Sequence, residues 1–176
     1  MGTGPRPCVG CGASVPDDPG PTHRYLGASP GCWRLYGELL GRKYADYRRF
    51  APVHRLTVDA YAAQHPGTPS PQSVGSVAAH LIRLHLQLER GPPYDRANDA
   101  MLGISSRSKE DFVWLEPPDN LGDVTVLDVL EARDPEEHMG RVRGWAASVW
   151  EAWAPHHETV RRWAVGEAYP KIAKGR

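Results

Sequence analysis

The stretch CVGCGASVPDDPGPTHRYLGASPGCW, from Cys8 to Trp33, contains all three cysteines of the 176-residue chain. His23 lies between the second and the third cysteine. Residues 1–28 are rich in proline, glycine and aspartate and show no hydrophobic period, so they cannot bury enough apolar surface to become ordered unaided. Whether the thiols act together therefore decides how the amino-terminal part of the chain folds.

The segment CVGCG is typical of a zinc knuckle. Two residues between Cys8 and Cys11 place both sulfur atoms on one side of a tight turn, and the neighbouring glycines permit the positive φ angles that this turn needs. Cys32 falls in the first turn of a predicted helix, where the helix dipole favours a thiolate. His23 can supply a nitrogen from the intervening loop. We therefore predict that Cys8, Cys11, His23 and Cys32 bind one metal ion, and we expect zinc.

Other interpretations of these residues exist. A disulfide framework fits poorly with an odd number of cysteines, and a redox CxxC pair would follow a strand at the start of a helix, whereas here only a proline precedes it. A CxxC pair can also occur by chance, with idle thiols. His23 is the least secure of the four ligands, and His54 or a histidine of the carboxy-terminal helix could replace it.

After residue 28 the apolar residues recur at steps of three and four, which predicts helices. Helix-start signals are Ser29, Ser70 and Asp134, each followed by proline, and the capping-box pair Thr125 and Asp128. The predicted helices cover 29–49, 52–65, 70–91, a short stretch from 125, 134–153, and a continuation beyond Pro155. We predict a mainly α, single-domain helical bundle: a core at 29–176 and a loop-rich, zinc-clamped segment at 1–28.

Several ionisable side chains lie at the margins of these helices. His54, Asp59, His65 and His80 are the candidate catalytic residues, and His157 is a further candidate for the same polar pocket. His54 and His65 would lie about 16 Å apart on one helix, too far to bind the same ion. The alternative is that each histidine is a hydrogen-bonded packing residue. Four tryptophans between 145 and 163 are expected to be core residues. The inner face of the helix predicted at 134–153 should carry His138, Val142, Trp145, Val149 and Trp153.

Charge and motifs exclude several function classes. Lysine plus arginine equals aspartate plus glutamate at 21 each, so no overall field attracts nucleic acid or an anionic membrane. No apolar run approaches the ~20 residues that span a bilayer. P-loop, GxSxG, GxGxxG and HExxH motifs are absent. We expect a soluble cytoplasmic protein that binds a small molecule or a protein and no membrane. Nucleic acid is a less favoured partner, although the zinc knuckle leaves it open.

Three longer motifs are GPTHRYLGASPGCWRLYGELL (20–40), HRLTVDAYAAQHPG (54–67) and VRGWAASVWEAWAPHHETVRRWA (142–164). With them the chain resembles, over nearly its whole length, an uncharacterised bacterial domain-of-unknown-function family. The resemblance implies no reaction. It implies only that the motif positions belong to the family pattern: Cys8, Cys11, His23, Cys32, His54, Asp59, His65, His80 and His157.

Two function classes follow. The first is a metal-dependent or histidine-dependent enzyme that acts on a small molecule; a closed four-ligand zinc site would then be structural and the chemistry would lie elsewhere. The second is a non-catalytic, zinc-stabilised module that binds a protein or nucleic-acid partner. The histidine and aromatic content of the helix margins favours the enzyme.

Overall fold

The computed structural model describes residues 4–90 and 112–164. The helices are α1 (Pro30–Ala45), α2 (Tyr47–Ala63), α3 (Pro71–His85), α5 (Val126–Leu130), α6 (Pro135–Ala152) and α7 (His157–Ala164), with a π-helical turn at Leu86–Arg90 and a 3₁₀ turn at Ala154–His156. Strands β1 (Arg6–Pro7) and β2 (Ser14–Val15) pair antiparallel and form the one small sheet of the described residues. The predicted mainly α class is confirmed.

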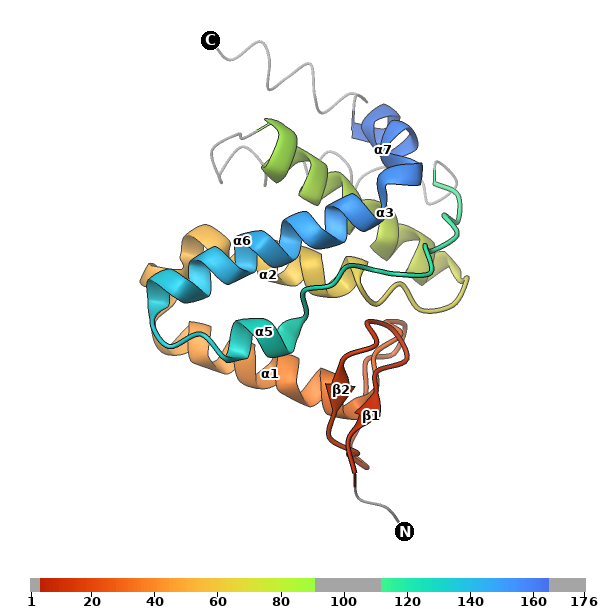
Figure 1. The fold of residues 1–176 in the computed structure, drawn as a ribbon. Helices are drawn as coiled ribbons and strands as arrows, with labels where there is room; N and C mark the ends of the chain where they lie inside the picture. Colours follow the sequence, from red (N-terminus) through yellow and green to blue (C-terminus); the bar gives the residue numbers. More distant parts are fainter. Residues whose placement is uncertain (1–3, 91–111, 165–176) are drawn as a thin grey trace.

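Helix α2 occupies the centre of the fold. It packs against α6 and α3, while α1 packs against α5 and α3 against α7 (Figure 1). The β1–β2 hairpin lies beside the start of α1. Every residue from Asp59 to Pro66 is buried, so the carboxy-terminal half of α2 is covered on all sides. This position brings the polar side chains of that half into the interior.

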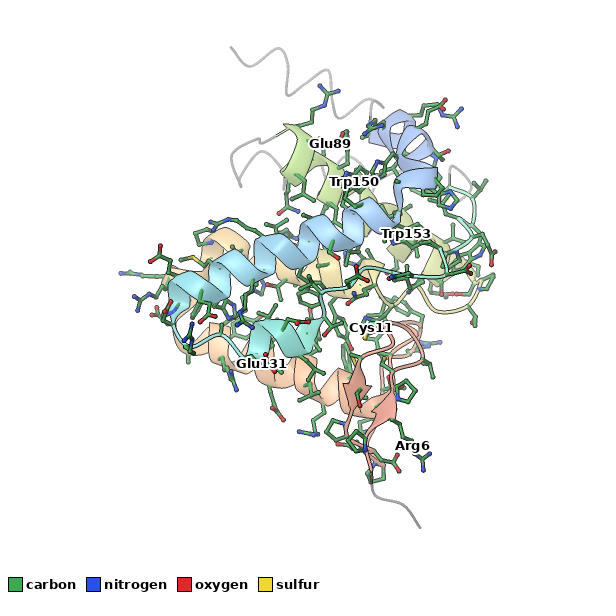
Figure 2. All side chains as sticks on the ribbon, in the orientation of Figure 1. Arg6, Cys11, Glu89, Glu131, Trp150 and Trp153 are labelled. Carbon is green, nitrogen blue, oxygen red and sulfur yellow. The ribbon has the colours of Figure 1, made fainter. Side chains whose placement is uncertain are left out.

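The face of α6 that packs into the core is the face predicted from the sequence. Trp145 Nε1 donates to Gln64 Oε1 at 2.9 Å, and Trp153 Nε1 donates to the carbonyl oxygen of Ala63 at 3.1 Å. Gln64 Nε2 in turn donates to carbonyl oxygens of the 121–124 loop, at 3.2 and 2.9 Å. The buried indoles thus have satisfied N–H groups, as a core requires. Figure 2 shows Trp150 and Trp153 where α6 approaches α3. The predicted inward residues are all buried: His138, Val142, Trp145, Val149 and Trp153.

Most of the predicted helix starts are confirmed. The side chains of Ser70 and Asp134 accept hydrogen bonds from backbone N–H groups in the first turns of α3 and α6, and Thr125 and Asp128 form a capping box. Ser29 precedes α1 as expected but does not cap it, because its hydroxyl accepts from the N–H of Val9 at 3.0 Å. Ser29 therefore ties the amino-terminal segment to α1.

The helix predicted at 29–49 ends earlier. Asp46 has φ −139° and ψ 64°, which are not helical, so α1 stops at Ala45 and α2 begins at Tyr47. Helix α2 then continues through Pro52, where a separate helix was expected to begin. No glycine or proline marks the break, so the periodicity alone could not locate it. None of the described helices is both long and apolar enough to cross a bilayer.

Lys43 is fully buried between α1 and α2, where Nζ donates to Thr57 Oγ1 and to the carbonyl oxygen of Val53. Burial lowers its pKa from 10.5 to about 7. The unfolded chain then binds more protons than the folded chain between these two pH values. Burial of Lys43 therefore lowers the free energy of unfolding by its full amount below about pH 7, and by a decreasing amount as the pH rises toward 10.5. We expect Lys43→Met to raise the free energy of unfolding by on the order of 2 kcal/mol at pH 7.

Urea denaturation of Lys43→Met and the wild type at pH 7 and pH 10 measures this effect. The difference between the two proteins should shrink at the higher pH. A variant that is less stable than the wild type at pH 7 would contradict the prediction.

Candidate metal centre

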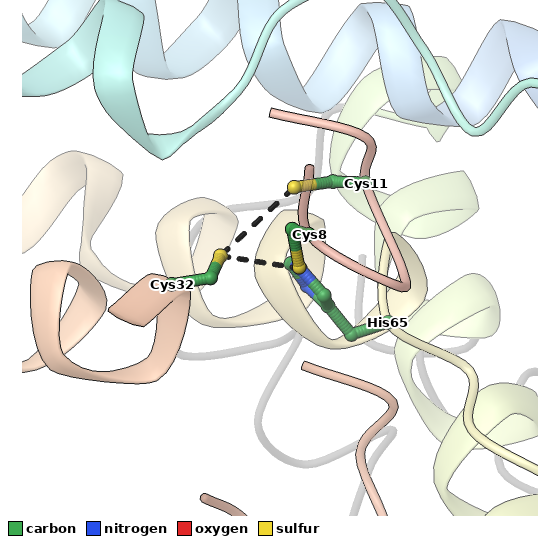
Figure 3. Close-up of side chains that lie close together, drawn as sticks. All are labelled: Cys8, Cys11, Cys32 and His65. Atoms are coloured by element: carbon green, nitrogen blue, oxygen red, sulfur yellow. Dashed lines mark hydrogen bonds between the residues drawn. The ribbon is translucent and has the colours of Figure 1, made fainter. Parts of the chain in front are cut away.

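Four side chains converge where the amino-terminal hairpin meets α1 and α2. One ligand atom from each of Cys8, Cys11, Cys32 and His65 lies within 4.8 Å of all the others (Figure 3). His65 Nε2 is 3.6 Å from Cys8 Sγ and 3.4 Å from Cys32 Sγ, and Cys11 Sγ is 3.9 Å from Cys32 Sγ. A zinc ion bound by sulfur and nitrogen in a tetrahedron separates its ligands by about 3.4–3.8 Å. The cluster could therefore hold a metal ion, and we call it the Cys3His cluster.

Three separate segments supply the ligands. The turn between β1 and β2 carries Cys8 and Cys11; it is closed by hydrogen bonds from Cys8 N–H to Ala13 O at 2.8 Å and from Gly12 N–H to Cys8 O at 2.9 Å. Gly12 has φ +72°, as expected for a glycine in this turn. Cys32 lies in the first turn of α1. The fourth side chain, His65, follows the end of α2, so the cluster joins the hairpin to two helices.

His65 is oriented for metal binding. Its Nδ1–H donates to the carbonyl oxygen of Tyr61 at 2.7 Å, because a carbonyl can only accept. This bond engages Nδ1 with the backbone and leaves Nε2 facing the sulfur atoms, which is the arrangement of most metal-bound histidines. The ring is fully buried, so it cannot swing into solvent.

The sulfur atoms have supporting donors of their own. The N–H of Ser29 donates to Cys8 Sγ at 3.4 Å, and the hydroxyl of Tyr61 donates to Cys32 Sγ at 3.7 Å. Burial and the neighbouring thiols raise the pKa of Tyr61, so this hydroxyl keeps its proton. The Tyr61 ring stacks on Tyr36, with centroids 3.8 Å apart. These contacts fix the side chains of Cys8 and Cys32, and the stacked Tyr36 ring fixes Tyr61 in turn.

The ionisable groups of the cluster lie so close together that they shift one another's pKa values in opposite directions. Hydrogen bonds from Cys11 and Cys32 lower the pKa of the Cys8 thiol, whereas Cys11 and Cys8 raise the pKa of Cys32. Burial lowers the pKa of His65, but its hydrogen bonds with Cys11 and Cys8 outweigh burial and raise the pKa to about 9. Several thiolates this close together repel one another unless a cation lies among them. A divalent ion fits this charge pattern.

The three cysteines come together as predicted, but the histidine that joins them is His65 and not His23. The structure places His65 at the cluster and His23 elsewhere: His23 Nδ1 accepts from the N–H groups of Tyr25 and Leu26 at 3.4 and 3.3 Å, and its ring contacts Trp33. From the sequence, His65 is only a catalytic candidate on a helix shared with His54. The missed signal is Pro66, which disfavours a helical residue before it. Helix α2 ends at Ala63, two residues before His65, so the imidazole ring can face another element.

The other candidate catalytic residues separate into three places. Asp59 and His80 meet, with Asp59 Oδ1 2.8 Å from His80 Nδ1. His54 lies apart, packed between Tyr44 and Tyr47. The remaining candidate is a packing residue, because His157 stacks on Trp150 with centroids 3.8 Å apart and its Nε2 bonds to a carbonyl oxygen. Among the described candidates, a shared polar site therefore contains Asp59 and His80, and His65 belongs to the Cys3His cluster.

A helical fold whose amino-terminal hairpin meets two helices through three thiols and an imidazole defines a candidate helical metalloprotein. Residues 6–154 match the model of the family of unknown function DUF5946, and the chain belongs to that family. The resemblance to an uncharacterised family is thereby confirmed. No curated protein and no solved structure matches the chain.

Proposed function

We propose that the Cys3His cluster binds one Zn²⁺ as a structural centre, and that the protein is a zinc-stabilised helical protein. The observation that carries the proposal is that the four ligand atoms lie within 4.8 Å of one another, although they come from separate segments. Three thiolates and one imidazole form a soft, tetrahedral donor set that suits zinc better than magnesium, calcium or manganese.

A structural role follows from the ligand count. Four protein ligands fill the tetrahedral coordination of zinc, which leaves no position for the water of a catalytic site. Two of the three sulfur atoms and the imidazole are buried, and only Cys11 is partly exposed. The ion would link the hairpin to α1 and α2 and stabilise a segment with little apolar surface; such ions supply about 10–16 kcal/mol in isolated zinc fingers. Any histidine-dependent chemistry then has to use other residues.

The expected compartment is the cytoplasm, because the three thiols are free and a reducing environment keeps them available to a metal.

The zinc content of protein purified without added metal tests the zinc proposal directly. We expect one zinc per chain. Replacement by Co²⁺ should give the visible absorption of a tetrahedral site together with sulfur-to-metal charge transfer. A cobalt spectrum without charge-transfer bands would contradict ligation by the cysteines.

The choice of the fourth ligand gives a second test. We expect His65→Ala to weaken zinc affinity by on the order of 100-fold or more, because it removes a ligand from a buried site. His23→Ala should leave the affinity nearly unchanged, since its Nδ1 is engaged with backbone N–H groups. Competition with a chromogenic chelator measures both. Greater zinc loss in His23→Ala than in His65→Ala would restore His23 as the ligand.

A further inference from the structure

A cavity of about 160 Å³ lies beside the Cys3His cluster. Two histidines, His23 and His80, line it together with the aromatic side chains of Trp33, Tyr36 and Tyr61. Tyr61 belongs to both places, because its side chain lines the cavity and its hydroxyl donates to Cys32. We call this space the histidine cavity. None of its lining residues is a ligand of the Cys3His cluster.

His80 lines this cavity, and its Nδ1 is engaged on the protein side. Its Nδ1 lies 2.8 Å from a carboxylate oxygen of Asp59 and 3.1 Å from Nη2 of Arg83. The carboxylate can only accept and is the nearer of the two, so we assign the proton to Nδ1 and the lone pair to Nε2. Asp59 is fully buried and is held by Arg83 and Gln87, with both nitrogen-to-oxygen distances 2.8 Å. These contacts fix the carboxylate, which in turn fixes the tautomer of His80.

His23 presents the opposite group. Its Nδ1 accepts from two backbone N–H groups, so the proton of the neutral ring is on Nε2 and can be donated. Burial, and then the proximity of His80, lower the pKa of His23; burial also lowers the pKa of His80. Near pH 7 both rings are therefore uncharged. The two imidazoles of the cavity wall thus offer one acceptor and one donor, and neither carries a charge.

We propose that the histidine cavity binds a small uncharged molecule with one ring and a hydroxyl group. The hydroxyl donates to His80 Nε2, and His23 Nε2–H donates to the same oxygen or to an adjacent one. A cavity of about 150 Å³ holds one benzene ring, so the available space matches a single substituted ring. The rings of Trp33, Tyr36 and Tyr61 supply the flat, apolar walls. Asp59 is a positioning residue, which acts through the tautomer of His80.

This inference goes beyond the zinc centre and depends on different residues. Trp33 nevertheless follows Cys32 directly in the chain, so the test uses zinc-loaded protein and measures the zinc content of every sample. Absence of metal would contradict the zinc proposal, whereas loss of ligand binding in fully metallated protein would contradict the cavity proposal. The two failures are therefore distinguishable.

The test is a titration of ¹⁵N-labelled, zinc-loaded protein with phenol, followed through the imidazole nitrogens. We expect His80 to show the Nδ1–H tautomer and His23 the Nε2–H tautomer before phenol is added. Phenol should shift the signals of both rings in a saturable manner and leave His54, which does not line the cavity, unchanged. The opposite tautomer of His80, or no shift of either ring, would overturn the proposal.

Three variants complete the test. His80→Gln should lower phenol affinity about tenfold, the worth of one hydrogen bond. Asp59→Asn should move the His80 proton to Nε2 and weaken phenol binding by a similar factor, a change in tautomer that lost packing alone would not cause. His54→Gln is the matched control on α2 and should bind phenol as the wild type does. Wild-type affinity in His80→Gln would overturn the proposal, and the wild-type tautomer measurement decides the case if Asp59→Asn does not fold.

Discussion

Replacement of Cys32 by serine is expected to remove the bound metal and to lower the free energy of unfolding by on the order of 4 kcal/mol. Cys32 is fully buried and lies 3.4 Å from the imidazole of His65 and 3.9 Å from the sulfur of Cys11. A serine hydroxyl stays protonated near pH 7 and is a poor zinc ligand. The variant would also leave a polar group inside a cluster of thiols, so packing and metal binding are lost together.

Zinc analysis and urea denaturation, with and without a strong chelator, measure the Cys32→Ser effect. The chelator should destabilise the wild type toward the level of the variant and should not change the variant further. Cys11→Ser is the comparison within the cluster; it should cost less stability, because Cys11 is only partly buried. One zinc per chain in Cys32→Ser, with wild-type stability, would show that the cluster is not a metal site.

The parts of the fold that the sequence predicted well are determined by residues that lie close together along the chain. Ser70 and Asp134 each cap a helix whose first residue is proline, and these signals lie within a single turn. The break at Asp46 has no such signal. Its position is set by tertiary packing, in which α1 and α2 bury the side chain of Lys43 between them. Sequence periodicity cannot detect a break of that kind.

The same distinction applies to the candidate site. Cys8 and Cys11 share one turn, so their spacing alone predicts that their sulfur atoms converge. His65 comes 33 residues after Cys32 and reaches it only because the end of α2 meets the start of α1. The pairing of Asp59 with His80 likewise requires α2 to pack against α3. Both contacts depend on helix packing, which a single sequence does not specify.

The zinc centre and the histidine cavity share a structural basis. The segment that supplies Cys32 to the cluster also supplies His23 and Trp33 to the cavity. Tyr61 extends the connection, since it donates to Cys32 and stacks on Tyr36 of the cavity wall. If the cluster binds zinc as proposed, the ion would therefore also hold Tyr61 and Trp33 of the cavity wall in position.

Gly10, between the two cysteines of the hairpin turn, is a position where a single methyl group would strike the Cys3His cluster itself. A Cβ atom there would lie 2.4 Å from the carbonyl oxygen of Gly27 and 2.5 Å from Cδ2 of His65. Neither neighbour can yield, because one is backbone and the other is a buried ring held by Tyr61. We expect Gly10→Ala to displace the imidazole from the sulfur atoms, to weaken zinc affinity by on the order of 100-fold and to cost about 3 kcal/mol of stability.

Alanine variants of two other glycines distinguish this clash from the general effects of replacing glycine with alanine. Gly37 lies within α1 with open space around it, so Gly37→Ala should be neutral or stabilise by about 0.5–1 kcal/mol. Gly12 has φ +72° and no close neighbour, so Gly12→Ala should cost about 1 kcal/mol of backbone strain. Chelator competition and urea denaturation of the three variants test this order. If Gly10→Ala bound zinc as tightly as Gly12→Ala, the imidazole of His65 would have room to move and could not be a rigidly held fourth ligand.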